Sequence, residues 1–88
     1  MKVYKYAIAP QEVTVHQIPK DAEFLCAGPD PKGAPCLYFK VEPDAETEPR
    51  AFRIVGTGHD IPESLGYLVS LTMMGYHVFE VPAAHVGA

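Results

Sequence analysis

The segment of this 88-residue chain with the clearest chemical potential is Gly56-Thr57-Gly58-His59-Asp60. Its two glycines permit positive φ angles and can expose backbone N–H groups, which form a small anion-binding nest. His59 can accept, donate or carry a proton near neutral pH, and Asp60 can fix its tautomer or cap the turn that follows. We predict that this segment binds a ligand or partner. The structural alternative is that the glycines only let the backbone bend.

Two residues outside this segment complete the candidate site. Arg53, just upstream, could direct its guanidinium at the same ligand if it lies on the same face. Tyr67 is one of five tyrosines, and a phenol offers apolar area together with one hydrogen bond. The predicted binding residues are therefore Arg53, Gly56, Thr57, Gly58, His59, Asp60 and Tyr67.

No catalytic motif accompanies these residues. The glycines match neither G-x-x-x-x-G-K-[ST] nor G-x-G-x-x-G, and Ser64 and Ser70 lie in no nucleophile elbow. His16 and His77 fall on alternating segments, and we interpret them as half-buried strand residues rather than ligands. We expect a non-enzymatic protein that uses no cofactor, with a hydrolase centred on His59 as the remote alternative.

The two cysteines and four histidines show no spacing typical of a metal site, so no metal is expected. Cys26 and Cys36 are predicted to be free thiols, and a disulfide across a hairpin is the alternative. The N-terminal residues lack the apolar region of a signal peptide, which predicts a cytoplasmic protein.

The charge balance narrows the range of partners. Seven Lys and Arg residues against eleven Asp and Glu give a net charge of −4, which offers no basic footprint for nucleic acid. Four of the acids alternate through residues 42–48, and we interpret them as a solvated loop. No run of about 18 apolar residues is present, so no membrane span is predicted.

Nine prolines and seven glycines, spread along the chain, leave no room for long helices. The apolar runs between them alternate with a period of two, which predicts strands. These strands cover residues 2–8, 12–18, 23–27, 36–42, 50–55 and 76–81. Residues 28–35 are predicted to be a loop. Residues 61–65 are predicted to form a single turn and 67–74 a strand, with a short helix over 61–73 as the alternative.

Six or seven short strands predict a mostly β fold, a small antiparallel sandwich or barrel that forms one domain over residues 1–88. The unpatterned tail, residues 82–88, is expected to fray. Because exposed sheet edges invite pairing, a homodimer is one way to cover them.

The segment PCLYFKVEPDAETEPRAFRIVGTGHDIP, residues 35–62, resembles a family of small proteins of unknown function encoded by bacteriophages and prophages. The IPKDA turn at residues 18–22 and the HVFE strand at residues 77–80 extend the resemblance over nearly the whole chain. The resemblance implies a mostly β domain of phage origin. It carries over no catalytic residue.

These observations together predict that the protein acts by binding in the cytoplasm of a bacterial host. Its expected role is counter-defence or host takeover, in which it inhibits a bacterial protein complex or sequesters a small anionic, nucleotide-like signal. The alternative is a structural or assembly component of a phage particle that acts by oligomerisation.

Overall fold

The fold is described by a computed structural model for residues 1–9, 13–58, 60–61, 65–71 and 75–82. Within these residues the chain forms seven β-strands and no helix. In chain order the strands are β1 (Lys2–Ala7), β2 (Val13–Pro19), β3 (Glu23–Pro29), β4 (Pro35–Val41), β5 (Thr47–Gly56), β6 (Gly66–Leu71) and β7 (Tyr76–Val81). The prediction of a mostly β domain with six or seven short strands is confirmed.

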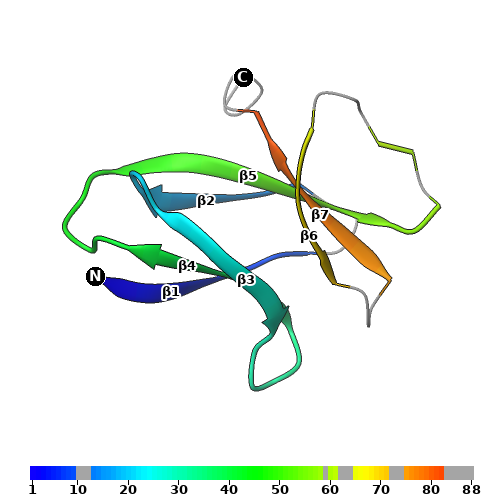
Figure 1. Cartoon of the computed structure of the whole chain (residues 1–88), viewed down its shortest axis with the longest axis horizontal. Helices are drawn as coiled ribbons and strands as arrows, with labels where there is room; N and C mark the ends of the chain where they lie inside the picture. The colour runs from blue at the N-terminus through cyan, green and yellow to red at the C-terminus, as the bar shows by residue number, and fades with distance from the viewer. Residues whose placement is uncertain (10–12, 59, 62–64, 72–74, 83–88) are drawn as a thin grey trace.

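The strands form two antiparallel sheets (Figure 1). The first sheet has three strands in the order β1-β4-β3, and the second has four in the order β2-β5-β7-β6. The sheets pack face to face as a sandwich, and at one side β3 of the first approaches β6 of the second. The long strand β5 pairs with both β2 and β7, so it organises the larger sheet.

Two predicted loops are shorter than the sequence suggested. Strand β5 begins at Thr47, so the prediction that the acidic loop extends to Glu48 is wrong. Pro49 is tolerated in this strand because pairing with β7 starts only at Ala51, which leaves one side of the strand free there. The predicted loop at residues 28–35 shrinks to residues 30–34, because β3 and β4 extend their pairing to Pro29 and Pro35.

The helical alternative over residues 61–73 is wrong where the structure describes it. Gly66–Leu71 is a strand that pairs with β7 along its length, and its β-branched and aromatic side chains favour that state. The predicted turn at residues 61–65 falls mostly on residues 62–64, which lie outside the described residues. The predicted frayed tail likewise lies outside them from residue 83 onward.

Phe39 lies at the centre of the core between the sheets. Its ring packs against Tyr6, Phe24 and Phe52 with centroid separations of 5.8, 5.5 and 5.9 Å. Alternation along β4 and β5 brings these inward side chains together, because every second residue of each strand points to the same face. The core cluster comprises Ile8, Ile18, Leu37, Phe39, Val41, Phe52, Ile54, Leu71 and Val78.

An ion pair also lies on the inner side of the larger sheet. Arg50 donates from Nε and Nη2 to the two carboxylate oxygens of Glu80, at 2.7 and 2.8 Å, and from Nη1 to the carbonyl oxygen of Ala22 at 3.2 Å. Its guanidinium lies 4.9 Å from the centre of the Phe39 ring. The hydrogen bonds with Glu80 raise the pKa of Arg50 above its usual value, although burial opposes them. This contact fastens β5 to β7 and holds a charge against the aromatic core.

Candidate binding surface

The candidate site lies on the outer face of the four-stranded sheet, which points away from the core. Strand register defines the row that contains Arg53. This residue is paired with Val13 on β2 and with Phe79 on β7, and Phe79 is paired in turn with Tyr67 on β6. The next row contains Val55, His77 and Ser70. We call the surface formed by these two rows, together with Val15, Ala51 and Val81, the outer face.

Arg53 is the charged residue among the strand positions that make up this outer face. Its side chain lies between apolar neighbours, and it takes part in none of the ion pairs formed among the described residues. An arginine fork is suited to a planar carboxylate or a phosphate. The outer face therefore presents a cation, while the chain as a whole carries a net charge of −4.

Large apolar side chains surround this arginine at the surface. Val13, Val15 and Tyr67 are 52%, 51% and 57% exposed. Phe79, Ala51 and Val55 of the same face are buried, and the Tyr67 ring packs edge-on against Phe79 at 5.2 Å. A group of exposed apolar side chains around a polar centre is typical of a surface that contacts a partner.

A β-bulge between Tyr67 and Val69 sets which residues of β6 face outward. Val69 pairs with the buried Val78, and the extra residue Leu68 lets Tyr67 pair with the outward-facing Phe79. Tyr67 therefore lies on the opposite face from Val69 and Leu71, whereas strict alternation along the predicted strand at residues 67–74 would place all three together. The bulge brings Tyr67 to the same face as Ser70, and the two hydroxyl groups form a hydrogen bond.

His77 connects the predicted residues Thr57 and Tyr67. Its Nε2 lies 3.0 Å from the Thr57 hydroxyl, and its Nδ1 lies 3.2 Å from the hydroxyl of Ser70, which contacts Tyr67. His77 and His16 are half-buried strand residues, as predicted. His77 and Ser70 were nevertheless missed as members of the site. Their cross-strand pairing depends on the register of β6 and β7, which alternation alone does not reveal.

The glycine-rich turn lies at the end of β5, next to this chain of hydrogen bonds. Gly58 has a φ of +88°, and a Cβ added there would meet open space. The backbone N–H and the hydroxyl of Thr57 both donate to the carbonyl oxygen of Gly75, at 3.0 and 3.1 Å. The Thr57 N–H is thus engaged within the protein rather than offered to an anion. Gly56 ends β5 opposite Tyr76, Asp60 is exposed, and His59 lies outside the described residues.

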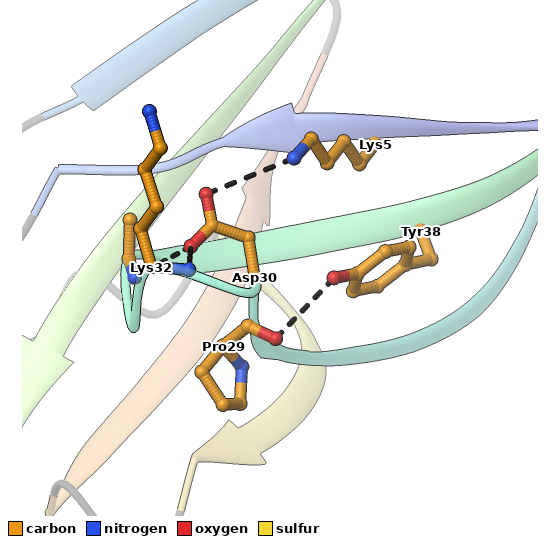
Figure 2. Close-up of polar contacts among 6 residues, drawn as sticks. Lys5, Pro29, Asp30, Lys32 and Tyr38 are labelled. Atoms are coloured by element: carbon orange, nitrogen blue, oxygen red, sulfur yellow. Dashed lines mark hydrogen bonds and ion pairs between the residues drawn. The ribbon is translucent and has the colours of Figure 1, made fainter.

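The other turn rich in glycine and proline, between β3 and β4, is held by its own contacts (Figure 2). Asp30 Oδ1 accepts hydrogen bonds from the backbone N–H groups of Lys32 and Ala34, at 2.8 and 2.9 Å, and Oδ2 faces the Lys5 ammonium at 3.8 Å. The N–H of Ala34 is the largest of the contacts that lower the pKa of Asp30 below its usual value. The aspartate and its turn satisfy each other, so this loop has a structural explanation.

The two cysteines lie on adjacent strands of the three-stranded sheet. Both are free thiols, with Cys26 exposed and Cys36 buried. Cys26 pairs with Tyr38, and Cys36 pairs with Gly28, which places the two cysteines diagonally rather than directly opposite each other. Burial raises the pKa of Cys36 above its usual value. In the part of the chain that the structure describes, no three His, Cys, Asp or Glu side chains gather as metal ligands, and no helix could cross a membrane.

Fold and surface together define a small antiparallel β-sandwich whose larger sheet carries an apolar outer face with one arginine. The chain belongs to a family described as a domain of unknown function, DUF7352, whose model matches residues 1–87. No curated protein and no solved structure matches the chain.

Proposed function

We propose that this domain is a non-catalytic binding module, and that its outer face holds the acidic surface of a protein partner. The observation that carries the proposal is the position of Arg53. It stands in the middle strand of an apolar face, and no described carboxylate forms an ion pair with it. A carboxylate supplied by a partner would complete a charge pair from which water is excluded by the surrounding apolar contacts.

The apolar neighbours of Arg53 favour a protein over a small anion. Val13 and Val15 extend the face along β2, on the opposite side of Arg53 from Tyr67. A small anion would contact the arginine and leave these valines in water. A protein surface could cover them, and aromatic residues and arginine are the anchors most enriched in such interfaces.

The resemblance to proteins encoded by bacteriophages directs the choice of partner toward a bacterial host. On this proposal the domain acts in the bacterial cytoplasm, where it occupies the functional surface of a host protein as a counter-defence or host-takeover inhibitor. Recognition would be electrostatic at its centre and apolar at its margin, so it should weaken as salt rises.

The test is capture of a host protein by the immobilised full chain in three forms: wild type, Arg53→Glu, and the matched control Lys2→Glu. Lys2 lies exposed on β1 of the other sheet, so its replacement changes the net charge equally without altering the outer face. We expect wild type and Lys2→Glu to retain one stoichiometric host protein at low salt. Arg53→Glu should retain at least tenfold less of that protein, because two negative charges then face each other.

Three results would contradict the proposal. One is capture that survives Arg53→Glu. Another is heat of binding with cyclic nucleotides or ADP-ribose in calorimetry together with no protein captured, which would point to a sequestered signal. A third is a discrete high-order ring or tube in light scattering, which would favour the assembly role.

A further inference from the structure

The hydrogen bonds around His77 have a defined direction. The Thr57 hydroxyl has one proton and lies 3.1 Å from the Gly75 carbonyl oxygen, which can only accept. The Thr57 oxygen must therefore accept from His77 Nε2, at 3.0 Å. In a neutral imidazole Nδ1 is then the acceptor, so it receives the Ser70 hydroxyl proton at 3.2 Å.

This direction continues to the edge strand. Because the Ser70 proton is directed at His77, the Ser70 oxygen is left to accept from the Tyr67 hydroxyl. The chain therefore runs from Tyr67 to Ser70 to Nδ1 of His77, and from Nε2 to Thr57 and the Gly75 carbonyl oxygen. Every proton has an acceptor, and Tyr67 presents only an acceptor lone pair to the exterior.

Protonation of His77 must reverse one half of this chain. An imidazolium has two N–H donors and no acceptor. Its Nε2–H still finds Thr57, but Nδ1–H now points at Ser70, whose own proton must turn toward the Tyr67 oxygen. The Tyr67 proton is then displaced toward the exterior. Hydroxyl rotations alone achieve this change, with every heavy atom in place.

We propose that His77 is a proton-operated switch for the outer face, an inference that rests on the proposed function of that face. In the neutral state the face offers the Arg53 cation and a tyrosine acceptor. In the protonated state it offers two cations and a tyrosine donor, which together would strengthen the contact with an acidic partner. Such a switch needs a side chain that can gain or lose a proton without moving its heavy atoms, and the two ring nitrogens of an imidazole meet that need.

None of the described groups that face His77 is a carboxylate that would hold it permanently protonated. On β5 the guanidinium of Arg53 lies one row away on the same face, and Thr57 is neutral. On β6 the facing groups are Ser70 and the phenol of Tyr67. Glu80, on β7 itself, points to the inner side and binds Arg50. A partner carboxylate near Arg53 would thus be the group that favours the imidazolium, so binding and proton uptake should reinforce each other.

Nuclear magnetic resonance of the full chain tests the switch without any partner. At pH 8 the imidazole nitrogen spectrum of His77 should show the Nε2–H tautomer. On titration to pH 5 the Tyr67 Cζ shift should change with the same midpoint as His77. Ser70→Ala should abolish this coupling in Tyr67 and still let His77 titrate, while Tyr4, on the other sheet, should stay flat throughout. An Nδ1–H tautomer at pH 8, or a flat Tyr67 signal in the wild type, overturns the inference.

A second measurement separates the switch from the surface it controls. Binding of the host protein captured by the wild type should be about fivefold tighter at pH 6 than at pH 8, and His77→Gln should remove that dependence. If the wild type binds equally well at pH 6 and pH 8 while Arg53→Glu still disrupts binding, the switch is defeated and the binding surface stands. If Tyr67 titrates together with His77 but Arg53→Glu has no effect on binding, the switch stands and the proposed binding surface is defeated.

Discussion

The two faces of the four-stranded sheet each carry one arginine from β5, and the two residues have different surroundings. Arg50 points inward, where Glu80 accepts two of its hydrogen bonds and the Phe39 ring lies beneath it. Arg53 points outward to a row that contains Phe79 and Tyr67, and no described carboxylate pairs with it. Three residues along a strand reverse the face, so the sequence places similar side chains in opposite environments.

This difference separates an arginine that stabilises the fold from one to which the proposed function assigns recognition. Strand β7 offers Glu80 to the inner arginine and Phe79, its neighbour in sequence, to the outer one. The inner site is therefore complete within the fold, whereas the outer arginine lies beside Phe79 and pairs with no carboxylate among the residues that the structure describes. On the smaller sheet two cations have partners within the fold, since Lys5 forms an ion pair with Asp30 and Lys40 forms one with Glu23. Arg53 stands out from these paired cations.

The largest expected contrast is between aromatic residues on the two faces. Phe52 is fully buried on the inner side, whereas Tyr67 is 57% exposed on the outer side. Phe52→Ala should lower the free energy of unfolding by about 4 kcal/mol, since it leaves a cavity in the core. Tyr67→Ala should cost about 1 kcal/mol, mostly from its contact with Phe79. Urea unfolding followed by circular dichroism measures both, and equal losses would contradict the assignment of the faces.

The two arginines give the next contrast. Arg50→Met should lower the free energy of unfolding by about 2 kcal/mol, because it strands the half-buried carboxylate of Glu80. Arg53→Met should change it by no more than about 0.5 kcal/mol, the usual range for a surface position. The same urea titrations apply.

A double-mutant cycle supplies the control. Arg50→Met combined with Glu80→Leu should cost less than the sum of the two single changes, with a coupling of about 1 kcal/mol or more. Additive losses would show that the ion pair does not couple β5 to β7. A loss from Arg53→Met as large as that from Arg50→Met would give Arg53 a structural role.

The sequence predicted the fold well because alternation is a local property. A period of two over residues 36–42 places Leu37, Phe39 and Val41 on one face, and all three are buried in the core. The same period over residues 50–55 places Phe52 and Ile54 on one side and Arg53 on the other, and the structure has this division. Each of these faces follows from neighbours two residues apart, so no knowledge of the partner strand was needed.

The site was predictable only in part, because its contacts depend on register. Arg53, Thr57 and Tyr67 do lie on or beside one surface, but His77 joins the latter two. Arg50 and Glu80 are thirty residues apart and meet only once β5 and β7 are aligned. The bulge at Leu68 was hidden as well, since an extra residue in a strand leaves an apparently regular pattern of side chains.

Asp30, unlike Arg53, has its charge and hydrogen bonds satisfied within the described part of the fold. Its carboxylate, with a lowered pKa, stabilises the fold fully above the ordinary aspartate pKa of about 4. That contribution is lost as the pH falls through the lowered value. Asp30→Asn keeps an acceptor for the turn but loses the charge, so its melting temperature should fall below that of the wild type at pH 6. The two curves should converge once the pH has fallen below the lowered pKa of Asp30.

The control for this titration is Asp44→Asn, at an exposed turn position between β4 and β5. It should differ little from the wild type at any pH. If Asp30→Asn keeps the same deficit from pH 6 to pH 2, the carboxylate charge is not what holds the β3–β4 turn.

The smallest expected effect on stability, at a valine of the outer face, is also the one that most sharpens the comparison. Val15→Thr keeps a β-branched side chain at a position that is 51% exposed, so the free energy of unfolding should change by no more than about 0.5 kcal/mol. Val41→Thr makes the same chemical change in the core and should cost about 2 kcal/mol, because it buries a hydroxyl group without a partner. In the capture assay the ranking of the two variants should reverse. Val15→Thr should weaken retention of the host protein several-fold, and folded Val41→Thr should retain it.

If Val15→Thr leaves capture unchanged, the partner contacts Arg53 without covering β2, and the occupant of the outer face is smaller than a protein surface.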